Sequence, residues 1–228
     1  MPTMTLYSGP LSMFGAKAHI AALEKGLPVE IVMVPFTADH RYEPRHPEVL
    51  RVNPKRQVPV LVHGEVELFD STQIFEYFED LQPQPPLWPV PVARRAQARL
   101  LELKSDEVFF PHVIRLMGLQ DELDEPPALE AITKLNDYYV RMDALLADRE
   151  FLAGDYSYAD IAFFMAQLFA ARLGAPMSDA APRLVAWRAR VARRPAVLPI
   201  VRQFAQTLAE MRRPIPEFMS GALASVAG

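Results

Sequence analysis

The sequence of 228 residues contains no cysteine. Cysteine supplies the sulfur nucleophiles, soft metal ligands and disulfides of proteins, so its absence excludes disulfides, Cys-ligated zinc and CxxC redox chemistry. If the protein takes part in sulfur chemistry, the sulfur has to come from a substrate. We also expect no metal site, because no HExxH or comparable pairing occurs among the histidines at positions 19, 40, 46, 63 and 112.

Two further absences bear on location and partners. The opening residues MPTMTLYSGPLSMFG lack a cationic start followed by an apolar run, and no window approaches the roughly 18 apolar residues that a membrane span needs. We therefore expect a soluble, cytoplasmic protein with no membrane partner. The formal net charge of −4 disfavours nucleic acid as a partner, because phosphate binding depends on clustered cations.

The first 81 residues alternate between strand and helix patterns. The elements expected are a strand at 4–7, a helix at 16–25, a strand at 29–34, a short helix within 37–51, strands at 58–62 and 66–69, and a helix capped by Asp70. The early β-α-β order implies parallel pairing, and the glycine turn at 63–65 predicts an antiparallel hairpin. The order is therefore βαβαββα.

The remaining residues predict helices only. Five prolines among the ten residues 82–91 predict a stiff connector, so we expect a domain at 1–81, a Pro-rich linker at 82–92 and an all-helical domain at 93–228. Pro111 should bend the first of the later helices, and Ser157 to Asp160 has the form of a capping box. Helices are expected near 93–118, 127–148, 158–172, 182–192 and 195–211.

Several segments, taken in order, resemble the glutathione transferase family and together cover nearly the whole chain. They are Leu6 to Ile20 (first strand, active-site loop and first helix), Asn53 to Leu61 (the NPxGxVPxL signature), Asp70 to Tyr77 (the acidic-serine helix start), Gly154 to Ala162 (the capping box) and Trp187 to Pro195. The chain departs from the family pattern at Met13, where many bacterial members have proline. It also departs at Arg56, where glycine is common, so we do not expect a positive φ there.

The resemblance implies a thioredoxin-like α/β N-terminal domain and an all-α helical bundle, with glutathione as co-substrate and a homodimer as the assembly. It implies that Val58, before a cis Pro59, pairs with the cysteinyl backbone. The positive end of the following helix suits the γ-glutamyl group. The remaining expected contacts are Ser71 for the γ-glutamyl carboxylate, Asp70 for its ammonium, and Arg45 and Gln57 for the glycyl carboxylate.

Chemistry at this site depends on the glutathione thiol, whose pKa starts near about 8.5. A shift of about two units needs roughly 2.7 kcal/mol of preference for the thiolate. One hydrogen bond to a charged group supplies about 1.5–3 kcal/mol and a helix N-terminus about 0.3–1. We favour the hydroxyl of Ser12 as the donor, and Tyr7 at the end of the first strand is the alternative, as in other branches of the family.

The second substrate should bind between the domains. We expect a small hydrophobic electrophile in a pocket lined by Phe109, Phe110 and His112, although aromatic residues at helical spacing often pack in a core instead. The expected activity is a detoxifying glutathione transferase. A glutathione-dependent isomerase or dehalogenase would use the same half-site, and a non-catalytic interaction or regulatory protein is the competing class.

Overall fold

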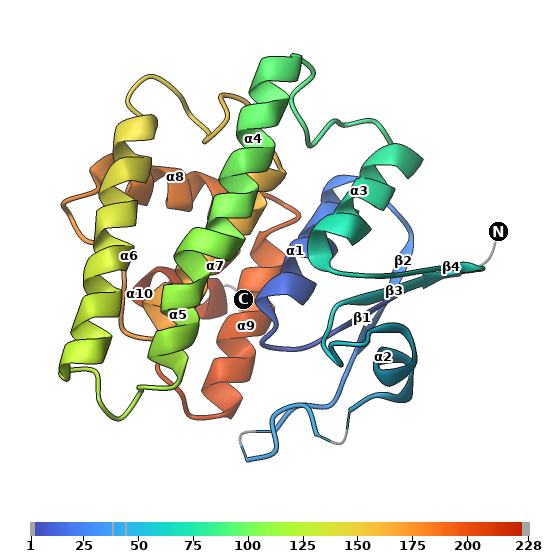
Figure 1. The fold of residues 1–228 in the computed structure, drawn as a ribbon, viewed down its shortest axis with the longest axis horizontal. Helices are drawn as coiled ribbons and strands as arrows, with labels where there is room; N and C mark the ends of the chain where they lie inside the picture. Colours follow the sequence, from blue (N-terminus) through green and yellow to red (C-terminus); the bar gives the residue numbers. More distant parts are fainter. Residues whose placement is uncertain (1–2, 38, 44, 225–228) are drawn as a thin grey trace. The chain divides into compact units, whose positions relative to one another are not determined.

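The computed structural model describes residues 3–37, 39–43 and 45–224 (Figure 1). Contacts within the chain divide it into two compact units. The first comprises Met1–Pro85 and Pro195–Arg213, and the second comprises Pro86–Arg194 and Pro214–Gly228.

A four-stranded mixed sheet organises the first unit. Its strands β1 (Met4–Ser8), β2 (Val29–Met33), β3 (Val60–His63) and β4 (Val66–Phe69) lie in the order β2-β1-β3-β4. β1 pairs in parallel with β2 and antiparallel with β3, and β3 forms an antiparallel hairpin with β4. The predicted parallel pair, hairpin and thioredoxin-like order are therefore confirmed.

Helices cover both faces of this sheet. Helices α1 (Met13–Glu24) and α3 (Ser71–Leu81) pack against each other, whereas α2 (Pro47–Val52) lies on the opposite face and contacts β3 and β4 (Figure 1). The side chains of β1 alternate accordingly: Leu6 and Ser8 are buried and Tyr7 is only partly buried. β1 thus carries the chain from the middle of the sheet into the start of α1.

Lys25, at the end of α1, is buried together with its charge. Its Nζ donates to the carbonyl oxygens of Gln82 (2.8 Å) and Pro85 (2.7 Å) and pairs with the carboxylate of Glu79. A buried ammonium is tolerated only when its donors are satisfied, and three oxygen partners meet that need here. The sequence indicated Lys25 only as part of a helix stop. In the structure, its hydrogen bonds hold the segment that follows α3.

Helix α9 (Leu198–Glu210) differs in its placement from the sequence prediction. Residues 195–211 were expected within the all-helical domain at 93–228, but the contacts of Pro195–Arg213 join this segment to the first unit. Within that unit, Gln203 Nε2 lies 3.6 Å from the Met33 sulfur at the end of β2. The apolar stripe of α9, which includes Phe204 and Leu208, is buried. An amphipathic stripe shows which face is buried, but not against which partner.

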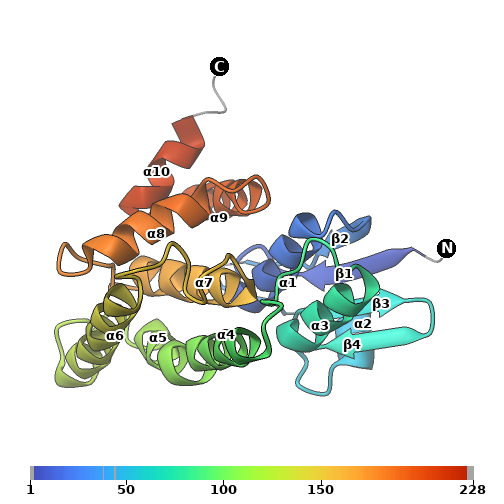
Figure 2. The same cartoon turned by 90° about the horizontal axis from the view of Figure 1, so that it is seen from above.

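The second unit is all helical, as predicted. Its elements are α4 (Val92–Lys104), the π-helical turn η1 (Ser105–Phe109), α5 (Phe110–Met117), α6 (Pro126–Leu145), α7 (Tyr158–Arg172), α8 (Pro182–Ala192) and α10 (Glu217–Ala224). Figure 2 shows α7 between α8 on one side and α4 and α5 on the other. The residues of α7 from Tyr158 to Ala170 are all buried, as befits a helix that is apolar on every side.

The bend expected at Pro111 takes the form of a π-helical turn. Proline has no N–H and its ring clashes with the carbonyl four residues earlier, so a regular α-helix cannot run through it. The backbone N–H of Phe110 instead donates to the oxygen of Ser105, five residues back. One predicted helix at 93–118 is therefore three consecutive helical segments.

A buried carboxylate organises the start of α7. Asp160 Oδ1 accepts from the Leu152 N–H (3.0 Å) and the Trp187 indole N–H (2.8 Å), and its Oδ2 accepts from the Ser157 N–H (2.9 Å) and hydroxyl (3.2 Å). The predicted capping box is thus confirmed. Burial raises the pKa of Asp160 to about 6, and these four donors act in the opposite direction by stabilising the carboxylate.

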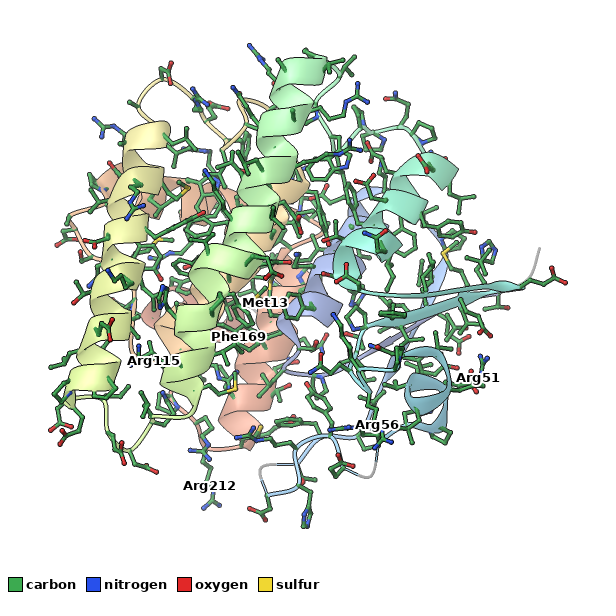
Figure 3. All side chains as sticks on the ribbon, in the orientation of Figure 1. Met13, Arg51, Arg56, Arg115, Phe169 and Arg212 are labelled. Atoms are coloured by element: carbon green, nitrogen blue, oxygen red, sulfur yellow. The ribbon has the colours of Figure 1, made fainter. Side chains whose placement is uncertain are left out.

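The backbone conformation of Arg56 differs from the expectation that its φ would not be positive. Its φ is +56°, in the left-handed region that had not been expected for a residue with a side chain, and it lies on the loop that leads into β3 (Figure 3). The Arg56 N–H donates to the Asn53 carbonyl at 2.8 Å and closes a turn. The turn therefore keeps the conformation that glycine favours although the glycine itself is missing.

Replacing Arg56 by glycine should relieve this backbone strain. An L-residue in the left-handed region costs roughly 1 kcal/mol relative to an unstrained one. We expect Arg56→Gly to be more stable to urea than the matched Arg56→Ala variant by about 1 kcal/mol, because both lose the side chain and only alanine keeps Cβ. Equal stability of the two variants would show that the turn is not strained.

Candidate functional site

Ser12 forms the N-cap of α1. Its φ of −102° and ψ of 114° are extended, its hydroxyl oxygen accepts the Gly15 N–H at 3.0 Å, and its residue is 8% exposed. The cap explains why α1 begins at Met13, three residues before the predicted start. Because the helix N–H occupies a lone pair of the oxygen, the hydroxyl hydrogen remains able to donate to an acceptor at the positive end of the helix.

A glycine in the first turn of α1 brings a second hydroxyl to this place. A Cβ built on Gly15 would lie 2.2 Å from Ser8 Oγ and 3.1 Å from Ser12 Oγ. Only glycine fits between them without a shift of the neighbouring side chains. Sequence reasoning did not identify Ser8, and the only available signal was a glycine inside a helical pattern.

The loop between β1 and α1 is braced by an aromatic ring. A Cβ on Gly9 would lie 2.4 Å from Tyr42 Cε1 and 2.5 Å from its hydroxyl oxygen, so this ring covers the Gly9 backbone. The Tyr42 ring also lies 4.7 Å from the ring of Phe36. Sequence reasoning missed Tyr42, because a glycine indicates a close approach but does not say which side chain makes it.

The same ring contacts a hydrophobic cluster on the α2 side of the sheet. The cluster is formed by Val34, Val49 and Val60, and both Tyr42 and Val58 pack against it. The loop between β1 and α1 and the residue expected to pair with a peptide ligand therefore share one support.

Asn53 holds the segment that contains Gln57 and Val58. Its Nδ2 donates to the Gln57 carbonyl at 2.6 Å, and its Oδ1 accepts the Lys55 N–H at 2.9 Å. Asn53 is 3% exposed, whereas the side chain of Gln57 is exposed. The Val58–Pro59 bond is cis, as the family resemblance implied. The sequence showed Asn53 only as a signature residue and did not indicate its bracing role.

The start of α3 presents Asp70 and Ser71. Asp70 has φ +75° and is the N-cap, since its Oδ1 accepts from the N–H groups of Thr72 (2.9 Å) and Gln73 (3.3 Å). This confirms the predicted cap. Asp70 is exposed, whereas Ser71 is 1% exposed at the first helical residue. The arrangement combines a carboxylate that can meet a cation with a helix end that favours an anion.

Arg45 is placed on the loop before α2. Its Nε lies 3.0 Å from Glu43 Oε1, and the two side chains are 35% and 58% exposed. An exposed pair of this kind contributes little energy, so a ligand carboxylate could exchange for Glu43 at small cost. The structure thus leaves Arg45 able to bind a ligand carboxylate in place of Glu43.

Tyr7 lies in different surroundings from Ser12. Its ring is 4.9 Å from that of His46 and packs on the α2 side against the valine cluster. Burial, followed by the negative charges of Glu48 and Glu30, raises the pKa of Tyr7. The same charges would disfavour a second anion beside this hydroxyl.

The residues expected to line an electrophile pocket have two kinds of environment. Phe109 is 1% exposed, and its ring lies 5.1 Å from Phe163 and 5.2 Å from Tyr138. Phe110 packs edge-on against Phe169 at 6.1 Å. Both rings are buried among other aromatic residues, and their role in lining a pocket stays a prediction. His112 is half-buried, and its pocket role stays a prediction.

The described residues also bear on metal binding and on membrane crossing. Among residues 3–37, 39–43 and 45–224, no group of three or more His, Asp or Glu side chains could hold a metal ion. Of the helices in these ranges, none has the length and apolar character that a membrane crossing requires.

Comparison with known proteins decides the family. Residues 6–86 match the glutathione S-transferase N-terminal domain and residues 106–195 match the glutathione S-transferase C-terminal domain. Glutathione S-transferase 3 of Zea mays is 30% identical over 95% of this chain and 98% of that protein. The chain belongs to the glutathione S-transferase family.

Two further similarities show the range of this glutathione S-transferase family. A solved glutathione S-transferase from Rhodospirillum rubrum is 26% identical, with a TM-score of 0.80 over 96% of this chain and 99% of that one. A stringent starvation protein A homolog from Coxiella burnetii is 29% identical over 67% of this chain and 68% of its own length. The family resemblance and fold are confirmed, and membership alone leaves the specific activity open.

Asn53 provides a test of how the segment around Gln57 and Val58 is supported. Asn53→Ala removes both side-chain hydrogen bonds, so we expect glutathione affinity to fall about 10-fold, equivalent to roughly 1.4 kcal/mol. Asn53→Asp keeps the acceptor for Lys55 but turns an oxygen toward the Gln57 carbonyl, and it should lose a similar amount. Calorimetric titration measures both values. Wild-type affinity in Asn53→Ala would contradict the bracing role.

Proposed function

We propose that the protein is a glutathione transferase that binds glutathione on its first unit and lowers the pKa of the bound thiol with the hydroxyl of Ser12. One observation carries the proposal: Ser12 caps α1 with its oxygen engaged by Gly15 and its hydrogen able to donate. Because the chain has no cysteine, the reacting sulfur is the substrate's.

The energy available at this position matches what the thiol needs. Lowering its pKa by about two units takes roughly 2.7 kcal/mol. A hydrogen bond to the thiolate contributes about 1.5–3 kcal/mol and the helix terminus about 0.3–1 kcal/mol. Serine is too weakly acidic to remove the thiol proton, so Ser12 stabilises the thiolate and the proton leaves to solvent.

The rest of the tripeptide is held by the neighbouring segments. The backbone of Val58, before the cis bond, pairs with the cysteinyl unit as an added strand. The γ-glutamyl carboxylate binds at Ser71 and the start of α3, and its ammonium meets Asp70. The glycyl carboxylate meets Arg45 and Gln57. The exposed Arg45–Glu43 pair and the exposed Gln57 side chain support this last assignment.

The bound thiolate then attacks a small hydrophobic electrophile. A sulfur–carbon bond forms, and the electrophile releases its leaving group or takes up a proton from solvent. His112 is the half-buried side chain proposed to face this substrate. The proposal extends to a cytoplasmic homodimer in detoxification, and isomerisation or dehalogenation would use the same half-site.

A second candidate is a non-catalytic interaction or regulatory protein. The similarity to a stringent starvation protein A homolog favours it. The presence of Ser12, the Val58–Pro59 pair and the Asp70–Ser71 pair favours the enzyme, since a protein that binds only other proteins has no need of all three. Retention on glutathione resin and turnover of a general electrophile separate the two classes.

Replacing Ser12 and Tyr7 in turn tests the mechanism. In Ser12→Ala we expect the pKa of bound glutathione, titrated by thiolate absorbance, to rise by about 1–2 units. At about pH 6.5 the thiolate fraction and kcat/KM should then fall about 5- to 50-fold, with glutathione affinity little changed. Tyr7→Phe should leave the thiol pKa near the wild-type value. If Tyr7→Phe alone raised it, the assignment to Ser12 would be wrong.

A further inference from the structure

The second unit contains a cavity that no part of the proposed glutathione site uses. Its volume is about 550 Å³, and it lies where the end of α7, the chain that follows it, α8 and the start of α10 meet. The apolar residues that line it include Pro176, Met177, Pro216 and Phe218. The charged side chains that line it are Arg188 and Glu217. This volume falls within the range of about 300–1,000 Å³ found for small-molecule sites.

Arg188 differs from other arginines of α8 in its partners. Arg183 donates to Asp143 Oδ2 at 2.9 Å, and Arg190 donates to the Glu150 carbonyl at 2.8 Å. In the described part of the chain, by contrast, the Arg188 guanidinium has no ion pair and no hydrogen-bond acceptor. Its guanidinium carbon instead lies 4.3 Å from the centroid of the Phe218 ring.

The guanidinium of Arg188 is also partly shielded from water. Arg188 is half-buried, and its burial lowers the pKa of the guanidinium while electrostatic interactions with Tyr139 and with the carboxylate of Glu217 act in the opposite direction. Withdrawing a cation from water without supplying an acceptor is unfavourable. An anionic ligand in the adjoining cavity would supply that acceptor.

We propose that this cavity binds an organic monocarboxylate with a flat apolar body. The carboxylate takes both donors of the planar Arg188 fork, a geometry that guanidinium and carboxylate share. The apolar body lies against Phe218, Met177 and the prolines. A cavity of this size is far larger than a simple inorganic anion, and the apolar residues of its lining can contact only a ligand that has an apolar part.

Glu217 sets the limit on ligand charge. It is exposed and lines the same cavity, so its negative charge opposes every anion that enters. Because the site has one cation and one anion, it should prefer a single carboxylate to a dicarboxylate or a phosphate. This gives the two charged residues opposite effects on the same ligand.

The test uses 2-naphthoate as the probe and 2-naphthamide as its neutral counterpart of the same shape. Calorimetric titration of the full-length protein should give binding of 2-naphthoate at least about 10-fold tighter than binding of 2-naphthamide. Arg188→Met should weaken 2-naphthoate by about 10-fold or more and leave 2-naphthamide nearly unchanged. Glu217→Gln should tighten 2-naphthoate by about 2- to 5-fold, most strongly at low salt.

Two controls separate the site from a change in fold or net charge. Arg193→Met removes the same charge from an exposed position and should bind 2-naphthoate like wild type. Glu217→Gln alters an exposed side chain and is expected to bind 2-naphthoate more tightly. This variant therefore tests the proposal even if Arg188→Met does not fold. Urea unfolding of each variant identifies any variant that is not folded.

The titration is repeated with S-hexylglutathione at saturation, which fills both halves of the proposed active site. Binding of 2-naphthoate should persist, because the cavity lies in the second unit and shares no residue with that site. The inference is overturned if S-hexylglutathione displaces 2-naphthoate, if 2-naphthamide binds equally well, or if Arg188→Met and Glu217→Gln both bind like wild type. None of these results depends on catalysis, so a failure here is distinct from a failure of the proposed transferase activity.

Discussion

The hydrogen bond from the Gly15 amide to the Ser12 hydroxyl is the interaction on which the rest of the first unit depends. It ends the loop that follows the central strand β1, and it starts α1 with the correct cap. The same oxygen carries the hydrogen that is proposed to meet the substrate sulfur. A structural need of the helix and a chemical need of the site are thus met by one side chain, because a helix start both requires an acceptor and stabilises an anion.

The proposed catalytic role of this cap requires that the neighbouring segments are held in register with it. Tyr42 covers the Gly9 backbone and rests on the valine cluster that also supports Val58. Asn53 fixes the segment before Val58 through two hydrogen bonds. Such rigid support matters because a ligand held in a prepared geometry loses less binding energy to ordering the protein.

Much of the fold could be predicted from local patterns, and the failures have long-range causes. The strand at β1, the hairpin turn, the cap at Asp70 and the capping box of Ser157 and Asp160 are signals carried by a few adjacent residues, and each of these elements formed as expected. By contrast, the contacts of α9 with the first unit and the ring of Tyr42 on Gly9 depend on partners distant in sequence. The candidate site was predicted as residue types in a family pattern. Its braces, Tyr42 and Asn53, became visible only as contacts.

The most direct test of the account is a crystal structure with reduced glutathione bound. The account predicts the cysteinyl backbone paired with Val58 and the sulfur within hydrogen-bond distance of Ser12 Oγ, about 3.0–3.6 Å for a hydroxyl and a thiolate. A sulfur bound to the Tyr7 hydroxyl instead, or a protein that takes up no glutathione at saturating concentration, would contradict it.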